Sequence, residues 1–282
     1  MRFEKWQALG NDYLILETQN LPWDLSPKRI EWLCDPHFGV GADGILLLAR
    51  SEEAEFVATL RIFNPDGSEA ELSGNGAREA ILYLRRHGWT DEDVFAISTV
   101  AGPIVPTIIG ELTCAVDMGR ASTTSKDFPG GGEEGRGKLT SAGREWEFQH
   151  VSIGNPQCAI VVDADELDEL DLEQIGPEIE ANALFPNRTN VSFLAVEADR
   201  VRARIYERGV GETLSSGTGA SGAAVTAHLL GAPDHLIVEL EGGELEVEIG
   251  EGLAVRLTGW AEPVYAGELS PELLAALSEL DQ

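Results

Sequence analysis

The sequence has few cationic side chains. Its 282 residues include 20 lysines and arginines, of which only four are lysine, against 49 aspartates and glutamates, so the formal net charge is −29. An excess of negative charge on this scale repels the phosphates of nucleic acids and the headgroups of anionic membranes. We therefore expect neither a nucleic acid nor a membrane as a partner.

Cysteine is also scarce, and several common signals are missing. The three cysteines, Cys34, Cys114 and Cys158, fit neither a disulfide framework nor a zinc site of four ligands, so we expect them to be buried as small apolar side chains. No apolar run approaches the ~18–20 residues of a membrane-spanning helix, and the N-terminus lacks the pattern of a signal peptide. The histidines show no metal-ligand spacing, and no lysine lies in a motif for a pyridoxal phosphate Schiff base. These absences indicate a cytoplasmic globular protein without a metal or another cofactor.

The acidic, lysine-poor composition has two explanations. A salt-rich cytoplasm would screen the repulsion between the many carboxylates. A genome rich in G and C, which favours arginine codons, would explain the scarcity of lysine but less easily the net charge of −29. Both explanations remain open.

The chain contains an internal repeat. Its length is about twice that of a typical domain, and alignment of the chain with itself at an offset of 143 to 144 residues brings three segments into register. The paired segments are Gly10-Asn11-Asp12 with Gly154-Asn155-Pro156, Arg61-Ile62-Phe63 with Arg204-Ile205-Tyr206, and Ser73-Gly74-Asn75-Gly76-Ala77 with Ser216-Gly217-Thr218-Gly219-Ala220. Because the order and the offset agree, we expect two similar halves related by a pseudo-twofold axis.

Both halves have the same local pattern, in which a strand leads into a glycine-rich turn and then a helix. We expect helices over residues 77–86 and 220–230, and the second, which is almost entirely apolar, should be buried. The expected strands are residues 44–48, 60–64, 151–153, 159–162, 201–206 and 236–249. The fold class is therefore α+β. A polar, glycine-rich stretch at residues 121–138 is expected to be an exposed loop.

Three stretches match known nucleotide-binding motifs, but the sequence around each of them does not fit the motif. Residues 39–44 fit the dinucleotide pattern G-x-G-x-x-G but precede a strand-like run, whereas the motif requires a helix. Residues 217–222 fit the same pattern and open a helix, but no β-α-β unit follows. Residues 132–138 have the glycine and lysine spacing of a P-loop, but Leu139 replaces the required Ser or Thr.

The two glycine-rich turns are the strongest candidates for a functional site. A helix N-terminus presents unpaired N–H groups and a partial positive charge, so the turns at residues 74–76 and 217–219 are suited to bind a carboxylate. If the two halves face each other across a cleft, Ser73 and Ser216 flank one substrate carbon, as in a two-base racemase or epimerase. Alternatively, both serines are simply helix N-caps.

The motifs closely resemble those of diaminopimelate epimerases, in order, from Phe3 to about Glu268. The matching stretches are Gly10-Asn11-Asp12, residues 39–44, residues 63–71, Gly74-Asn75-Gly76-Ala77-Arg78, Gly154-Asn155-Pro156, Asn190-Val191, residues 206–214 and Gly217-Thr218-Gly219. The resemblance implies two pseudo-symmetric domains, each a strand-rich barrel around a central helix, with the active site in the cleft between them. We expect the first domain to comprise residues 1–118 and 265–282 and the second residues 119–264.

The resemblance also implies roles for individual residues. Asn64, Asn155, Asn190 and Arg208 would bind the carboxylate at the non-reacting centre of the substrate, and Glu207 would contact its amino group. Asn11 would lie at the reacting end, where the backbone N–H groups of Gly74, Asn75, Gly217 and Thr218 would bind the reacting carboxylate. The family further implies a cofactor-independent enzyme of lysine biosynthesis that interconverts LL- and meso-diaminopimelate, and a homodimer. Turn formation is the alternative role for each asparagine.

The chain departs from the family at the reacting groups. Ser73 and Ser216 stand where the family has its two acid/base cysteines, and Gln157 stands where it has a histidine. A hydroxyl is a much weaker acid than a thiol, so each serine would need a nearby base such as Glu207. The serines are either natural, or replacements of cysteine, or signs of a changed reaction; the further departures at Gln157 and Ser215 favour natural divergence. The remaining alternatives are a binding protein without turnover and a cofactor-free isomerase like those of phenazine biosynthesis.

Overall fold

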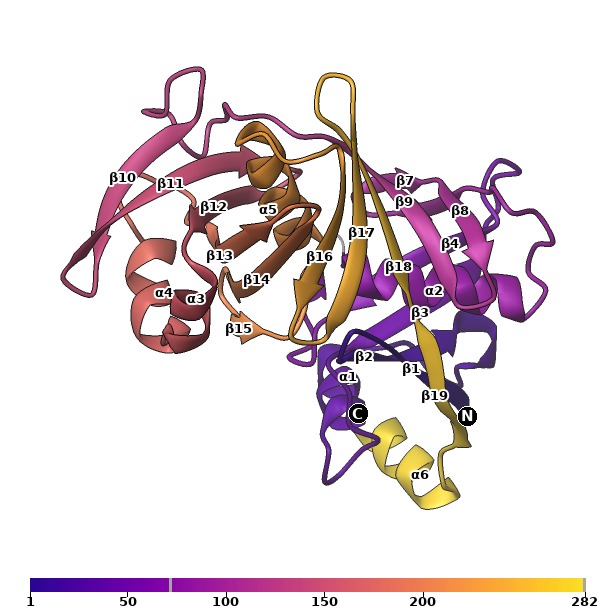
Figure 1. The fold of residues 1–282 in the computed structure, drawn as a ribbon. Helices are drawn as coiled ribbons and strands as arrows, with labels where there is room; N and C mark the ends of the chain where they lie inside the picture. The colour runs from indigo at the N-terminus through magenta and orange to yellow at the C-terminus, as the bar shows by residue number, and fades with distance from the viewer. Residues whose placement is uncertain (71–72, 281–282) are drawn as a thin grey trace. The chain divides into compact units, whose positions relative to one another are not determined.

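A computed structural model describes residues 1–70 and 73–280, which form two compact units (Figure 1). Unit 1 comprises Met1–Val116 and Trp260–Gln282, and unit 2 comprises Asp117–Gly259. The sequence analysis placed these boundaries after residues 118 and 264. Glu71, at the end of the motif at residues 63–71, and residues 281–282 of the first expected domain lie outside the described residues.

The sheet of unit 1 is built mainly from the first hundred residues and is completed by a strand from the end of the chain. Its strands follow the order β19-β1-β2-β3-β4-β6-β7, and β5 pairs with β4. The bounds are β1 (Arg2–Ala8), β2 (Asn11–Glu17), β3 (Ile45–Arg50), β4 (Ala58–Phe63), β5 (Glu69–Ala70), β6 (Ile97–Thr99), β7 (Gly102–Ile104) and β19 (Glu262–Glu268). Further along the chain, β8 (Pro106–Gly110) pairs with β9 (Thr113–Arg120).

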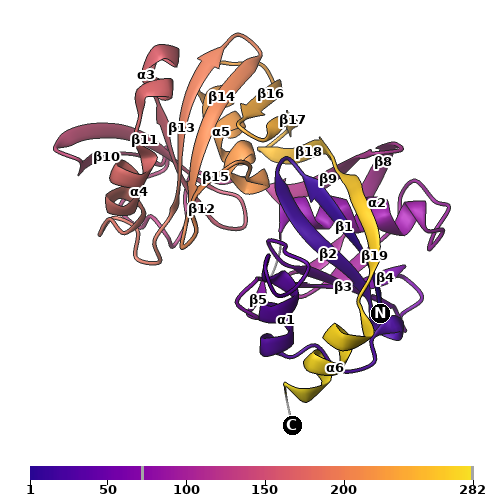
Figure 2. The same ribbon diagram turned by 90° about the horizontal axis from the view of Figure 1, so that it is seen from below.

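The helices of unit 1 are η1 (Thr18–Asn20), α1 (Pro27–Cys34), α2 (Gly74–Arg86) and α6 (Pro271–Glu279). Helix α2 packs against β1, β2 and β3, and every residue from Asn75 to Leu84 is buried. Helices α1 and α6 lie side by side (Figure 2), where Arg29 Nε donates to the Leu277 carbonyl oxygen at 2.8 Å. The end of the chain therefore belongs to the core of unit 1.

The sheet of unit 2 follows the order β10-β11-β12-β13-β14-β16-β17-β18, and β15 pairs with β14. The strands are β10 (Arg136–Ser141), β11 (Arg144–Ser152), β12 (Pro156–Val161), β13 (Asn190–Glu197), β14 (Arg200–Glu207), β15 (Gly211–Thr213), β16 (His235–Leu240), β17 (Gly243–Gly250) and β18 (Ala254–Trp260). The helices are α3 (Ala164–Glu169), α4 (Leu172–Glu180) and α5 (Gly217–Leu229). Helix α5 packs against β11, β12, β13, β14, β16 and β17, so the prediction of a buried apolar helix is confirmed.

The two units share one connectivity. In unit 1, β1 to β2 is antiparallel, β2 to β3 parallel, β3 to β4 antiparallel and β4 to β6 parallel. In unit 2, the same sequence of pairings joins β11, β12, β13, β14 and β16. In unit 1 the short strand β5 pairs with β4 and is followed by α2, and in unit 2 the short strand β15 pairs with β14 and is followed by α5. Both helices have 13 residues. The duplication predicted from the sequence is therefore a duplication of structure, and the α+β class is confirmed.

The prediction of an exposed loop over residues 121–138 is wrong in part. Phe128 is only 5% exposed, and its ring lies 5.2 Å from the ring of Phe148 and 5.5 Å from that of Phe185. Strand β10 already begins at Arg136. The prediction followed the polar, glycine-rich composition and did not take account of Phe128, whose side chain packs in the core of unit 2.

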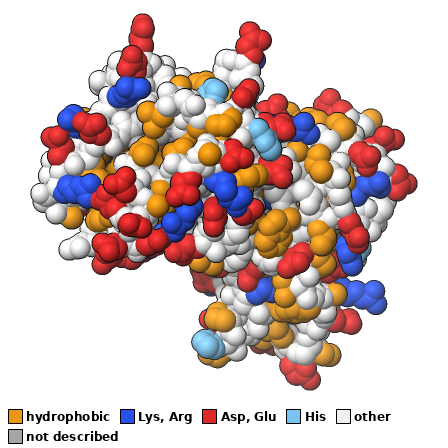
Figure 3. Space-filling model, in the orientation of Figure 1, with side chains coloured by type: hydrophobic (Ala, Val, Ile, Leu, Met, Phe, Trp, Pro, Cys, Tyr) orange, Lys and Arg blue, Asp and Glu red, His pale blue; other side chains and the backbone are white. Residues whose placement is uncertain are grey.

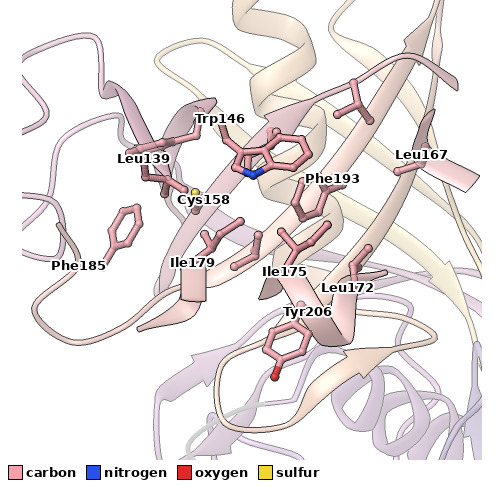
Figure 4. Close-up of a cluster of buried hydrophobic side chains, with 14 of the residues drawn as sticks. Leu139, Trp146, Cys158, Leu167, Leu172, Ile175, Ile179, Phe185, Phe193 and Tyr206 are labelled. Atoms are coloured by element: carbon pink, nitrogen blue, oxygen red, sulfur yellow. The ribbon is translucent and has the colours of Figure 1, made fainter. Parts of the chain in front are cut away.

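That core lies between the sheet and helices α3 and α4. Figure 4 shows Trp146, Phe193 and Ile175 facing one another, with the Trp146 and Phe193 rings 5.2 Å apart at nearly a right angle. Cys158 belongs to the same cluster, and Cys34 and Cys114 are buried in unit 1, so the prediction for the cysteines is confirmed.

Acidic side chains are spread over the visible face of both units (Figure 3). None of the helices within the described residues combines the length and the apolarity needed to cross a membrane.

Candidate active site

Ser73 caps the first turn of α2 in unit 1. Its backbone is extended, with φ −130°, and its Oγ accepts a hydrogen bond from the Gly76 N–H at 3.1 Å. A side chain at Gly76 would place Cβ 2.9 Å from Leu46 Cδ2, so glycine allows the turn to approach β3. The helix begins at Gly74, three residues earlier than predicted from the apolar pattern, because this cap extends it.

A second donor reaches the same serine. Tyr13 Oη donates to Ser73 Oγ at 3.2 Å, and the Tyr13 side chain comes from β2. Tyr13 is not among the site residues predicted from the sequence. The sequence contained a signal for it. Residues two apart on a strand share a face, so Tyr13 lies on the same side of β2 as the predicted site residue Asn11.

Asn75 links the helix to β2. Its Nδ2 donates to Asn11 Oδ1 at 3.3 Å, and Asn11 Nδ2 donates to Asp43 Oδ2 at 2.9 Å. Arg78, one turn into the helix, donates to Asn75 Oδ1 at 2.6 Å and to the Gly74 carbonyl oxygen at 3.1 Å. The structure thus brings together Asn11, Ser73, Gly74 and Asn75, and it adds Arg78.

Arg78 and its neighbour Glu79 are both 0% exposed. Burial raises the pKa of the Glu79 carboxyl well above its usual range, and the opposing attraction of Arg78 is smaller. Burial also lowers the pKa of the Arg78 guanidinium, which is bonded to Asn75 and Gly74 in the first turn of α2. The charge of Arg78 adds to the partial charge of the helix N-terminus.

Asn64 lies in the turn between β4 and β5. Its Nδ2 donates to Ser68 Oγ at 3.0 Å, and its carbonyl oxygen accepts from the Gly67 N–H at 3.0 Å. These are the contacts of a turn-forming asparagine. Among the residues that the structure describes, no hydrogen bond joins Asn64 to the cluster around Ser73, and its substrate role remains a prediction.

Ser216 caps α5 in unit 2 in the same way. Its Oγ accepts from the Gly219 N–H at 3.2 Å, and a Cβ at Gly219 would lie 2.5 Å from Ile205 Cδ1. Asn155 Nδ2 donates to Thr218 Oγ1 at 3.2 Å, and Gln157 Nε2 donates to Asn155 Oδ1 at 2.7 Å. Asn155 therefore lies at the start of the helix, with Thr218.

The contacts of the two turns correspond at the offset of the repeat. Asn155 with Thr218 repeats Asn11 with Asn75. The Ser221 hydroxyl donates to the Gly217 carbonyl oxygen at 2.8 Å, where Arg78 donates to that of Gly74. The ion pair of Arg204 and Glu212 at 2.6 Å repeats that of Arg61 and Glu69 at 2.8 Å. Each unit therefore carries one version of the same serine-capped turn, and the binding of an anion by these turns remains a prediction.

The other predicted residues of unit 2 cluster at the end of β14. Asn190 Oδ1 accepts from the Arg208 N–H at 2.9 Å, and Asn190 Nδ2 donates to the Pro156 carbonyl oxygen at 3.0 Å. Since Pro156 follows Asn155, this cluster adjoins the turn that holds Thr218.

Glu207 lies beside Arg208, but its contact differs from the expected one. Its Oε1 accepts from Thr213 Oγ1 at 2.9 Å, and the described residues show no hydrogen bond between Glu207 and Ser216. Burial raises the pKa of Glu207, although the Thr213 hydroxyl opposes the shift. The activation of a serine by Glu207 therefore remains a prediction. Thr213 was not predicted from the sequence, because its partner Glu207 lies on the neighbouring strand of a hairpin.

Comparison with known proteins agrees with these motifs. A family model described as diaminopimelate epimerase matches residues 3–124 and 149–259. The chain belongs to the diaminopimelate epimerase family. It is 42% identical to diaminopimelate epimerase 2 of Nostoc sp., with 98% of each chain covered. It is 38% identical to the diaminopimelate epimerase of Pelotomaculum thermopropionicum, with 95% of this chain and 98% of that protein covered.

Solved structures share the fold of this family member at low sequence identity. A phenazine biosynthesis protein from Bacillus anthracis has a TM-score of 0.68 at 22% identity, with 96% of this chain and 99% of that chain covered. A hydroxyproline epimerase from Agrobacterium vitis, solved with bound trans-4-hydroxy-L-proline, has a TM-score of 0.66 at 16% identity, with coverages of 97% and 94%. At such identities the likeness concerns the fold alone.

Proposed function

We propose that this protein is a cofactor-independent epimerase that interconverts LL- and meso-diaminopimelate for lysine biosynthesis. The observation that carries the proposal is the pair of equivalent serine-capped turns, in which Gly76 and Gly219 hold Ser73 Oγ and Ser216 Oγ by backbone N–H groups. Epimerisation needs two proton-transfer groups and a site for the reacting carboxylate. A duplicated turn that carries a hydroxyl and a helix N-terminus supplies both.

In this mechanism one serine, as the alkoxide left after its proton has passed to a base such as Glu207 or to solvent, removes the α-proton, and the other delivers its hydroxyl proton to the opposite face of the carbon. The backbone N–H groups of Gly74, Asn75, Gly217 and Thr218 stabilise the negative charge that develops on the reacting carboxylate. The electron pair of the broken C–H bond stays on the substrate until the new C–H bond forms. Solvent exchange then restores the two protein groups.

The distal end of diaminopimelate carries a second carboxylate and amino group, and we assign it to the remaining predicted residues. Asn64, Asn155, Asn190 and Arg208 bind its carboxylate, and Glu207 binds its ammonium group. The hydrogen bonds that hold Asn190 to Arg208 and Glu207 to Thr213 support this role, because they orient the side chains before the substrate arrives. We further infer that the protein acts in the cytoplasm as a homodimer, which sedimentation analysis would test.

Hydrogen exchange tests the proposal directly. On incubation with LL-diaminopimelate in D2O, the wild type should place deuterium at the reacting α-carbon and form the meso isomer. The Ser73→Ala, Ser216→Ala double variant should lose both activities. Ser270→Ala is the matched control, because Ser270 caps another helix, α6, and accepts from the Leu273 N–H at 3.1 Å.

Two outcomes would contradict the proposal. Binding of both isomers by calorimetry without any deuterium incorporation would make the protein a binder without turnover. Exchange that persists in the double serine variant at the wild-type rate would place the catalytic bases elsewhere.

A further inference from the structure

We propose that Tyr13 is a positioning residue that makes Ser73 a stronger acid than Ser216, so that the two proton-transfer groups are unequal. This inference rests on the proposed function, in which both serines transfer protons. It assigns a role in catalysis to a tyrosine hydroxyl that touches Ser73 rather than the substrate.

The hydrogen bonds at Ser73 fix the direction of its hydroxyl proton. A serine hydroxyl has one proton to donate and two acceptor positions. The Gly76 N–H and the Tyr13 hydroxyl donate to Ser73 Oγ at 3.1 Å and 3.2 Å. Both acceptor positions of Ser73 Oγ are therefore occupied, and its own proton is free to point toward a substrate. When Ser73 loses this proton, the resulting alkoxide accepts hydrogen bonds from the same two donors.

The Tyr13 ring is held in place by a glycine. Tyr13 is 6% exposed, and a Cβ at Gly44 would lie 2.7 Å from Tyr13 Cε1. The Gly44 carbonyl oxygen also accepts from the N–H of Leu14, the next residue of β2, at 3.0 Å. Gly44 closes the glycine motif at residues 39–44, which leads into strand β3 and not into the helix that a dinucleotide-binding motif requires. In this structure its last glycine makes room for the tyrosine.

Within the described residues, no second donor to Ser216 Oγ is found in unit 2. The repeat places Gln157 of β12 where unit 1 has Tyr13, and Gln157 Nε2 donates to Asn155 Oδ1 instead. Ser216 Oγ accepts from the Gly219 N–H. The position of unit 2 that corresponds to the buried Arg78 is occupied by Ser221, whose side chain is neutral. Both differences favour the alkoxide at Ser73 over the alkoxide at Ser216.

The difference between the two serines has a consequence for the transfer of the proton. When Ser73 donates, its O–H bond breaks, the proton forms the new C–H bond, and the negative charge moves from the substrate to Ser73 Oγ. Removing the Tyr13 hydroxyl raises the free energy of that product state and of the transition state leading to it. Because the Tyr13 hydroxyl contacts Ser73, its loss should appear in kcat and not in KM.

The first experiment compares Tyr13→Phe with Tyr83→Phe. Tyr83 is a matched control, because it is also buried in unit 1 but its hydroxyl donates to Glu17 at 2.8 Å. We expect Tyr13→Phe to lower kcat by ~100-fold, the lower end of the loss for one donor to a developing oxyanion, with KM unchanged. The rise of the rate with pH should also move to higher pH. Tyr83→Phe should change neither.

The second experiment asks whether Tyr13 acts through Ser73. A thiolate is far more stable than an alkoxide near neutral pH, so the cost of Tyr13→Phe should shrink at least several-fold in a Ser73→Cys background. It should keep its full size in a Ser216→Cys background. Equal costs in both backgrounds, or a loss confined to KM, would overturn the inference while leaving the proposed function intact. Absence of exchange in the wild type would instead overturn the proposed function, and the inference with it.

Discussion

Arg78 holds the side-chain carbonyl of Asn75 at 2.6 Å inside the protein, where neither side chain is more than 4% exposed. The contact fixes which way the Asn75 amide points, so its Nδ2 faces Asn11. A guanidinium with no exposed surface is costly unless its donors are used. Here two of them stabilise the turn that begins α2.

Replacing Arg78 should therefore destabilise unit 1. We expect Arg78→Met to lower the free energy of unfolding by about 2 kcal/mol, because it leaves a buried amide oxygen without its donor. Arg86→Met is the control on the same helix, since Arg86 is exposed, and should change the value by less than ~0.5 kcal/mol. Urea denaturation measures both. Equal effects of the two substitutions would show that the buried contacts of Arg78 add no stability.

Glu79 should make the stability of the protein fall as the pH rises. Its folded-state pKa is raised well above the usual value by burial. Above the unfolded pKa the unfolded chain has lost a proton that the folded chain retains, so raising the pH favours unfolding until the folded pKa is reached. Glu79→Gln removes this loss, and its stability relative to wild type should be greater at pH 8 than at pH 5.

Urea denaturation at both pH values measures this difference. Glu92→Gln, at an exposed site, is the control for charge alone. A Glu79→Gln variant whose relative stability is the same at pH 5 and pH 8 would show that Glu79 is ionised in the folded protein at neutral pH.

Thr213 should set the acid limit of substrate binding. Its hydroxyl donates to Glu207 and lowers the pKa that burial raises. Binding of a substrate ammonium group needs the charged carboxylate, so binding is lost as the pH falls through the pKa of Glu207. In Thr213→Val the pKa rises further, and the loss of binding should begin at higher pH.

Calorimetric titration with meso-diaminopimelate from pH 5 to pH 8 follows this limit. Thr258→Val is the matched control, a half-buried strand residue of unit 2. If the Thr213 and Thr258 variants lose binding over the same pH range, Glu207 does not contribute a titrating group to the site.

The net charge of −29 should make stability depend on salt. Screening shortens the Debye length from about 10 Å at 0.1 M to about 3 Å at 1 M, which weakens repulsion among the exposed carboxylates. The midpoint of thermal unfolding should therefore rise with KCl and level off near 1 M. A midpoint that is flat or falls over this range would contradict the explanation from a salt-rich cytoplasm and favour the one from genome composition.

Local pattern revealed much of the fold before the structure. The offset matches predicted the duplication, and the turns at Gly74 and Gly217 were predicted to lead into helices, although each helix begins three residues earlier than expected. The burial of α5 followed from its apolar composition. The loop at residues 121–138 was misjudged because the packing of Phe128 depends on Phe148 and Phe185, which are distant in the sequence.

The sequence by itself determined the family, the α+β class, the repeat and the positions of Ser73 and Ser216, because each depends on the order of residues along the chain. Only the tertiary structure decided the partners of those residues. Tyr13 and Ser73 are 60 positions apart and meet because β2 passes beneath the start of α2. Glu207 accepts from Thr213 because β15 folds back on β14. Side-chain hydrogen bonds reach only about 3 Å, so the chemistry of each serine depends on how the chain brings distant segments together.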